Sequence, residues 1–311
     1  MATITAAARW SSPTRLKLLT SRRLCFSAFS AASPTSAAGF CWSDALRVAG
    51  DDGRGDESDL SGYFRKVKTC NRGMDKKGQF VEFAVEDQVV GYIHKGFIEY
   101  LRDFHDVFTI VLDNNGSNTV EHVSLHSSLR TPEDRTHAIG SVIKSLGEMI
   151  PGIRNELYPV TSSYGMPVYF SLERAAAPYF GIKPYGISCK ENIIKECEEE
   201  AGIARSISTN AASVGAVSYM DIEGFRYKRD VLFCYDLKLP ADFVPNNEDG
   251  EVDSFRLIPV PHAANIIRRT EFFKPNCNLV IIDFLFRHGY INPDCRGYLG
   301  LLQSLRSGDC S

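Results

Sequence analysis

Three glutamates share one side of a predicted helix in the second half of the chain. In the stretch GISCKENIIKECEEEAGI, residues 186–203, Glu196, Glu199 and Glu200 fall at i, i+3 and i+4. In a helix this spacing brings their carboxylates within roughly 5–6 Å of one another. Carboxylates grouped in this way can bind a positive charge, unless local electrostatics provides another reason for grouping them.

Local electrostatics gives no such reason, because the glutamates lie in the last turns of the helix. Carboxylates near a helix C-terminus lose about 0.3–1 kcal/mol each, and like charges at i,i+4 repel by a few tenths of a kcal/mol. The spacing therefore predicts that something positive sits against this face. Glu198 points to another side and is expected to be solvated. The alternative is an acidic face that only contacts water.

Local signals define both ends of this helix. Ser188 followed by Glu191 fits a capping box, and Gly202 stands where a left-handed residue ends a helix. An apolar stripe is expected to pack the helix against the rest of the protein, and it consists of Ile194, Cys197 and Ala201.

The N-terminal segment differs in charge from the rest of the 311-residue chain. Residues 1–43 contain no acidic residue and are rich in Ser, Thr and Ala. Their basic residues are Arg9, Arg15, Lys17, Arg22 and Arg23. This composition predicts a transit peptide, for the chloroplast in preference to the mitochondrion, with an unaddressed disordered tail as the alternative. Its removal leaves a protein more acidic than the net charge of −3, which argues against a nucleic-acid partner.

Other site chemistries find little support in the sequence. The nine cysteines include no C-x-x-C pair, and the seven histidines show no ligand spacing, so we expect reduced thiols and no zinc site. No apolar run reaches the ~18–20 residues that a membrane helix needs. The expected partner is a small molecule, and the sequence does not indicate an oligomeric state.

The element pattern predicts a chain of α/β class, in the α+β form, with two domains after the leader. We expect a linker over 44–62, an α+β domain of unknown function over 63–180 and a second domain over 181–311. The predicted elements are a strand at 107–113, a helix from 131 to about 150, two strands around a turn at 222–224, a strand at 254–260 and helices at 261–269 and 278–289.

Aligned on Gly202, KECEEEAGI resembles the core of the Nudix box, G-x5-E-x7-R-E-U-x-E-E-x-G-U, in which U is a bulky aliphatic residue. The three glutamates and Gly202 match in type, Lys195 takes the place of the arginine, and Cys197 and Ile203 take the U places. The rest of the chain looks like the plant plastid Nudix hydrolases, which carry an extra N-terminal domain. That domain also occurs beside thiamine pyrophosphokinase in fungi.

The resemblance implies a chemistry for these residues. Carboxylates of the box hold Mg²⁺ or Mn²⁺ against a diphosphate, and water cleaves the phosphoanhydride. Glu196 and Glu200 are the expected metal ligands. Glu199 is expected to bind a second ion or to act as a base, and Lys195 to hold one of these carboxylates. Expected substrates are nucleoside diphosphate derivatives such as ADP-ribose and NADH, or oxidised thiamine diphosphate.

The family also implies a Nudix-type α/β/α sandwich with a mixed sheet, and here the sequence departs from the pattern. Ile187 replaces a glutamate of the box. PYFGIKPYG, residues 178–186, looks like the beginning of the first strand but joins the box helix directly. Two or more strands, roughly forty residues with their connections, are expected to be missing. The alternative function is therefore a catalytically impaired splice variant or truncated product that acts only as a binding protein.

Two other glutamates lie further along the chain. Glu248 and Glu251 occur in a loop where some members of the family keep another catalytic acid, although surface positions are the simpler interpretation. A third possibility is that the acidic helix is only a protein-docking surface, in which case Glu198 matters as much as Glu199.

Overall fold

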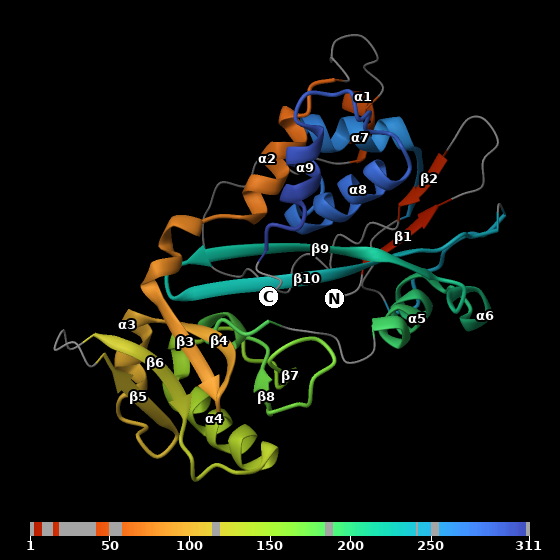
Figure 1. Cartoon of the computed structure of the whole chain (residues 1–311). Coiled ribbons are helices and arrows are strands. Elements are labelled where there is room, and N and C mark those ends of the chain that lie inside the picture. Colours follow the sequence, from red (N-terminus) through yellow and green to blue (C-terminus); the bar gives the residue numbers. More distant parts are fainter. Residues whose placement is uncertain are drawn as a thin grey trace. The chain divides into compact units, whose positions relative to one another are not determined.

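The computed structural model describes residues 3–7, 15–18, 42–49, 58–113, 119–183, 189–240, 242–249 and 255–308. The chain forms two compact units, each built from separated stretches of sequence. Unit 1 comprises 1–70, 188–217 and 232–307, and unit 2 comprises 71–187, 218–231 and 308–311. Helices and strands mix in both, which confirms the α+β class (Figure 1).

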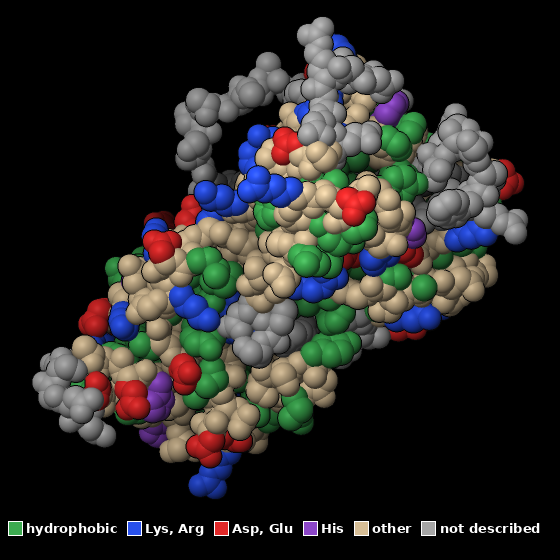
Figure 2. Space-filling view, turned by 45° about the horizontal axis from the view of Figure 1, so that its top comes forward, with side chains coloured by type: hydrophobic (Ala, Val, Ile, Leu, Met, Phe, Trp, Pro, Cys, Tyr) green, Lys and Arg blue, Asp and Glu red, His purple; other side chains and the backbone are tan. Residues whose placement is uncertain are grey.

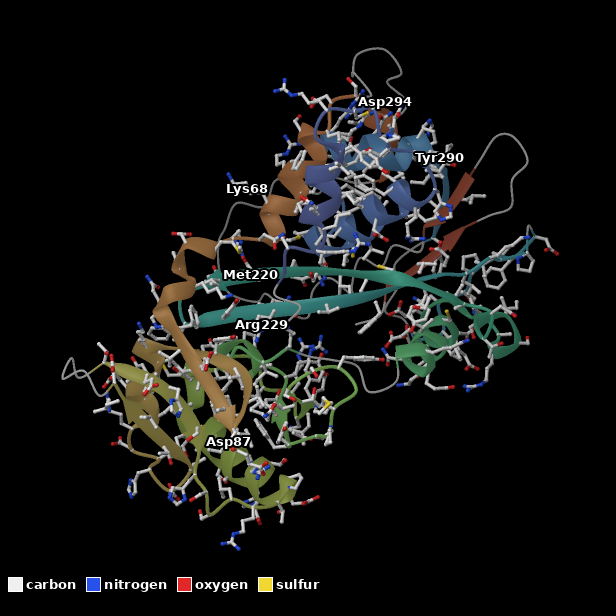
Figure 3. The ribbon with its side chains drawn as sticks, viewed as in Figure 1. Lys68, Asp87, Met220, Arg229, Tyr290 and Asp294 are labelled. Carbon is white, nitrogen blue, oxygen red and sulfur yellow. The ribbon has the colours of Figure 1, made fainter. Side chains whose placement is uncertain are left out.

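Unit 2 is built on a four-stranded sheet in the order β4-β3-β6-β5. Its strands are β3 (Phe80–Val85), β4 (Gln88–His94), β5 (Phe108–Leu112) and β6 (Val120–Leu125). β3 runs antiparallel to β4 and parallel to β6, and β5 runs antiparallel to β6. Asp87, labelled in Figure 3, lies in the β3–β4 turn. β5 confirms the strand predicted at 107–113.

Helix α4 (Pro132–Leu146) confirms the helix predicted from residue 131, although it ends four residues earlier. Thr131 caps it, and the Asp134 side chain completes a capping box with two hydrogen bonds. Gly147 then starts a short 3-10 turn, Gly147–Met149. The remaining elements of unit 2 are the helix α3 (Lys95–Ile98), the 3-10 helices η1 (Met74–Gln79), η2 (Glu99–Leu101) and η4 (Ala177–Tyr179), and the paired strands β7 (Leu157–Val160) and β8 (Phe170–Glu173).

The core of unit 2 is aromatic. Phe83 contacts three other phenylalanines, with ring centroids 5.6–6.4 Å apart, at the separations where aromatic rings attract one another. These partners are Phe108, Phe170 and Phe180, all buried.

One prediction for the 178–186 stretch is wrong. Its described residues, 178–183, belong to unit 2 and form the end of a 3-10 helix and a turn instead of a strand. Gly181 has φ +56°, and a Cβ there would lie 2.4 Å from the carbonyl oxygen of Tyr92. The buried Arg229 donates to the carbonyl oxygen of Gly181 at 3.3 Å (Figure 3). The left-handed φ of Gly181 is incompatible with an extended strand, and the missing side chain allows the close backbone approach.

Unit 1 contains a five-stranded sheet in the order β11-β2-β1-β10-β9. Its strands are β1 (Thr3–Ala7), β2 (Arg15–Leu18), β9 (Ala212–Glu223), β10 (Arg226–Asp236) and β11 (Arg256–Pro259). β1 runs parallel to β10 and antiparallel to β2, so the sheet is mixed, as expected. β9 and β10 confirm the strand pair predicted around residues 222–224. The half of each strand next to the turn, within 218–231, belongs to unit 2, and the other half of each belongs to unit 1.

Helices cover the unit 1 sheet. Figure 1 shows α2, α7, α8 and α9 on one side of the strands and α5 and α6 on the other. α7 and α8 confirm the two predicted C-terminal helices. The helices of unit 1 are α1 (Trp42–Ala49), α2 (Ser61–Cys70), α5 (Cys189–Ala201), α6 (Arg205–Ser208), α7 (Val260–Arg269), α8 (Pro275–Arg287) and α9 (Tyr298–Ser304).

Helix α8 carries a buried charge within its apolar sequence. The carboxylate of Asp283 accepts from Arg287 Nε and from Arg306 Nη2, both at 2.7 Å. Its side chain is only 1% exposed, so these two guanidinium groups compensate for its loss of hydration. This explains how an acid is accommodated in a helix that is otherwise almost entirely buried.

The strands β1 and β2 lie within the segment predicted to be a transit peptide. They occupy the places between β10 and β11. A strand edge without its neighbour is a template for any extended segment, and strands of the family pattern are expected, from the sequence, to be absent before α5. Cleavage near residue 43 would therefore take two strands from this sheet. Cleavage itself stays a prediction, as do the domain boundaries.

The surface carries both signs of charge. On the face shown in Figure 2, Lys and Arg side chains are interspersed with Asp and Glu side chains. Among the described helices, none is both long and apolar enough to cross a membrane.

Candidate functional site

Helix α5 packs through the apolar side that the sequence predicted. Ile194, Cys197 and Ala201 are at most 2% exposed. Cys197 and Ala201 belong to a buried cluster that joins the helix to the end of β10 and the residues after it. The other members of this cluster are Ile193, Ile203, Ala211, Tyr235, Leu237 and Leu239. Because this side is fixed in the core, the glutamates of α5 are held at the surface.

The end of α5 is also as predicted. Gly202 has φ +61°, its N–H donates to the carbonyl oxygen of Glu198 at 3.0 Å, and the N–H of Ile203 donates to that of Cys197 at 3.0 Å. These bonds satisfy carbonyls that a helix end otherwise leaves open. Ser188 lies outside the described residues, so the capping box at the other end stays a prediction. Glu191 forms an ion pair with Arg205 at 2.8 Å.

The three box glutamates, which we call the α5 carboxylates, are Glu196, Glu199 and Glu200. All three are half-buried, whereas Glu198 is exposed, as expected for a side chain that points elsewhere. The ε-amino group of Lys195 lies 3.5 Å from Oε1 of Glu199. Since both side chains are about half exposed or more, this ion pair orients Glu199 but contributes little to stability.

The pKa of the Cys197 thiol is shifted by burial and by nearby charge. This pKa is raised to about 12, mainly by burial and in smaller part by the negative charges of Glu200 and Glu196. The carboxylates of Glu196 and Glu200 therefore both lie near the sulfur atom of Cys197. The thiol stays protonated at neutral pH, which makes it a packing residue and a poor metal ligand or nucleophile.

A loop from beyond β10 covers the C-terminal end of α5. The N–H groups of Glu248 and Asp249 donate to the carbonyl oxygen of Glu199 at 3.2 and 3.1 Å, and the N–H of Asn246 donates to that of Ala201 at 3.1 Å. Glu248, one of the two loop acids considered from sequence, is thus brought to the helix. Glu251, the other, lies outside the described residues.

The contribution of Asn246 was not predicted. Its side-chain amide donates to Oε1 of Glu248 at 2.7 Å. The sequence PNNEDGE signals a turn through its Asn, Asp and Gly residues, but nothing in it shows which helix the turn contacts.

The donor chemistry of the α5 carboxylates fits a hard divalent cation, which prefers several carboxylate oxygens. In the part of the chain that the structure describes, no three His, Cys, Asp or Glu side chains are already gathered around one point that could hold a metal ion. The α5 carboxylates share a face, but their side chains have to rotate to converge. Glu196, Glu199 and Glu200 are the residues that would hold the ion.

Comparison with known proteins defines the class to which this arrangement belongs. The chain is 51% identical to "Nudix hydrolase 20, chloroplastic" of Arabidopsis thaliana, covering 88% of this chain and 84% of the relative. It is 52% identical to "Nudix hydrolase 24, chloroplastic" of the same plant, covering 82% and 80%. The chain therefore belongs to the Nudix hydrolases, enzymes that act on pyrophosphate bonds and generally need divalent metal ions.

Two further comparisons match only part of the chain. A family model described as "Domain of unknown function (DUF4743)" matches residues 62–184. An uncharacterized protein of Saccharomyces cerevisiae is 43% identical over 123 residues, 36% of this chain and 35% of the relative. The predicted extra domain is thus present. Both Arabidopsis relatives are chloroplastic by name, which confirms the expected location.

The alignment with "Nudix hydrolase 20, chloroplastic" shows that this relative has residues that the present chain lacks. It runs over 319 positions, more than the 311 residues of this chain, while covering only 88% of the chain. The relative therefore has several tens of residues without a counterpart here. The position of this gap, directly before α5, stays a prediction.

Proposed function

We propose that this protein is a Mg²⁺- or Mn²⁺-dependent Nudix pyrophosphatase that cleaves the diphosphate linkage of a small molecule. The substrates we propose are nucleoside diphosphate derivatives, such as ADP-ribose and NADH, or oxidised thiamine diphosphate. The observation that carries the proposal is the half-buried face of α5, where Glu196, Glu199 and Glu200 are held in place by the buried Cys197 side of the helix.

The residues of α5 would have two roles, binding of the cation and transfer of a proton. Glu196 and Glu200, which both act on the thiol of Cys197, would hold the cation. Glu199 would bind a second ion or accept a proton from the attacking water, and Lys195 orients its carboxylate from 3.5 Å. A bound divalent cation neutralises the diphosphate and lowers the pKa of its bound water. In the reaction, the oxygen of water joins one phosphorus, the bridging P–O bond breaks, and two phosphate products leave.

A catalytically impaired product that acts only by binding is the second candidate. The residues that the relative has in addition favour it, as does the sheet, in which β1, from the N-terminal segment, pairs with β10. Under this alternative, unit 2 folds around its aromatic core and binds a ligand or partner without hydrolysis.

One experiment separates the two candidates. Purified protein is incubated with ADP-ribose, NADH or oxidised thiamine diphosphate in the presence of Mg²⁺ or Mn²⁺, in water enriched in ¹⁸O. Formation of two phosphate products, one carrying the label, supports the hydrolase. The Glu196→Gln/Glu200→Gln variant is the control, and Glu198→Gln is the matched control on the exposed side of the helix. Equal loss in Glu198→Gln and Glu199→Gln would instead support a docking surface.

A further inference from the structure

The turn between β9 and β10 carries a phenylalanine that packs within unit 2. Phe225 follows Gly224, which has φ +56°. The ring centroid of Phe225 lies 4.9 Å from that of His94 and 6.1 Å from that of Phe97. Gly96 gives this ring room, because a Cβ there would lie 3.0 Å from Cε1 of Phe225. The tip of the strand pair is therefore held by side chains at the start of α3.

His94, the last residue of β4, is also the N-cap of α3. Its Nδ1 accepts from the N–H of Gly96 at 2.9 Å, so this nitrogen carries no proton. Its Nε2 lies 3.3 Å from Oε1 of Gln79, an acceptor, and therefore donates to it. Phe80 packs edge-on against the imidazole at 5.0 Å. The imidazole is thus neutral and fixed by a donor on one side and an acceptor on the other.

A second proton on the imidazole would disturb this arrangement. It would go to Nδ1 and remove the acceptor for the N–H of Gly96. Burial, and after it the positive charge of Lys95, lower the pKa of His94 from its ordinary value of 6.5. Aromatic rings attract cations, and the lowered pKa means that burial and Lys95 outweigh that attraction at His94.

Several charged groups lie on the elements that surround the imidazole. From α3, η2 and the β9–β10 turn they are Lys95, Glu99, Arg102, Glu223 and Arg226. Glu99 and Arg102 pair with each other at 2.7 Å, and Lys95 is the charge that acts on the imidazole. η1 and β3 contact it through Gln79 and Phe80, which do not titrate. Because Glu223 and Arg226 flank the turn, assigning a pH effect requires variants of His94 itself.

We propose that His94 and Phe225 form a pH-sensitive latch, in which the neutral imidazole caps α3 and holds the β9–β10 turn, whereas the protonated imidazole loosens it. The latch is fully closed above the ordinary histidine pKa of 6.5. It weakens as the pH falls below this value, because the open form binds the proton more readily than the closed form. The inference concerns residues of unit 2 alone and does not depend on the proposed function.

The test is hydrogen–deuterium exchange of the full chain between about pH 7.5 and about pH 5, measured by mass spectrometry on peptides from 218–231. Dividing the intrinsic exchange rate at each pH by the observed rate gives a protection factor. We expect the wild-type protection factor of 218–231 to fall about two- to tenfold toward pH 5, the larger figure corresponding to one pKa unit. Peptides from α4, in the same unit, should keep theirs and so show that the fold is intact.

Four variants of the full chain assign the effect. His94→Asn keeps a side-chain acceptor at the N-cap but does not titrate, so its protection factor should not change with pH. Lys95→Gln should move the fall to higher pH, and Phe225→Leu should lower protection of 218–231 throughout the range. The matched control is His126→Asn, which should behave like the wild type, since His126 Nδ1 accepts from the N–H of Ser128 at 3.3 Å.

Three results would overturn the inference. A wild-type protection factor that stays constant over this range shows that the latch does not respond to pH. A fall of equal size in His94→Asn assigns the pH effect to another group. Wild-type protection in Phe225→Leu shows that the ring does not hold the turn.

Discussion

The backbone N–H of Glu248 donates to the carbonyl oxygen of Glu199 across 3.2 Å. This bond joins a residue of the box helix to a loop that follows it by about fifty positions in the chain. The end of α5 is therefore defined by the loop as well as by the helix, and Gly202 lies where the two meet.

Replacing Gly202 with alanine should destabilise the protein by about 1–2 kcal/mol, because φ +61° is unfavourable for any residue with a Cβ. The new methyl would also press on Oε1 of Glu248. Urea unfolding of the wild type and the variant measures the loss. Gly140→Ala, at a partly buried position of α4 where a Cβ meets nothing within 4 Å, is the control and should be neutral or stabilising. Equal stability of Gly202→Ala and wild type would show that the loop and helix end are not held as described.

Lys195→Gln should change the free energy of unfolding by less than about 0.5 kcal/mol, since its ion pair with Glu199 is exposed. Its effect should appear in activity, as a lower kcat, because Glu199 loses the group that orients it. Lys195→Arg keeps the charge and should retain most of the activity. Steady-state kinetics beside urea unfolding provides both measurements, and a loss of stability without a loss of kcat would contradict the role given to Lys195.

Alkaline pH should weaken the fold through two buried thiols. The pKa of Cys197 and that of Cys234 are each raised to about 12, mainly by burial, from an ordinary value of 9.0. The unfolded chain therefore releases these protons first. Stability is fully retained below pH 9 and falls as the pH rises from 9 toward 12, by about 1 kcal/mol per thiol at pH 10.

Urea unfolding between pH 7.5 and 10 checks this dependence. In the Cys197→Ala/Cys234→Ala variant, the free energy of unfolding should decline less steeply with pH than in the wild type, whatever its value at neutral pH. A decline of the same slope in the variant would mean that other groups cause it.

The extra residues of the relatives lead to a prediction about rate. This chain should be less stable than "Nudix hydrolase 20, chloroplastic", and its kcat should lie well below the ~1–10³ s⁻¹ of ordinary enzymes. The comparison uses both purified proteins with ADP-ribose and oxidised thiamine diphosphate under the same metal conditions. Turnover by this chain within that range would refute the expectation that a catalytic part of the sheet is missing.

Local patterns allowed α5 to be predicted, since the periodicity of Ile194, Cys197 and Ala201 and the glycine at 202 depend on neighbours in sequence. The same holds for α4, whose capping box spans Thr131 to Asp134.

Long-range contacts set the limits of prediction. The structure of residues 178–183 is not predictable from the sequence, because only the fold shows that Gly181 packs against the backbone of Tyr92. The bond from the N–H of Asn246 to the carbonyl oxygen of Ala201 joins a loop to a helix distant in sequence, and the pairing of β1 with β10 depends on an edge of a sheet. No periodicity in the sequence reports on contacts of this kind.

The central claim, that the α5 carboxylates bind a divalent cation, is tested most directly by calorimetry with Mn²⁺. The folded wild-type chain, checked by circular dichroism, should take up the ion stoichiometrically, and Glu196→Gln/Glu200→Gln should lose this uptake while remaining folded. Absence of heat from a folded wild-type sample, or equal uptake by the double mutant, would contradict the account.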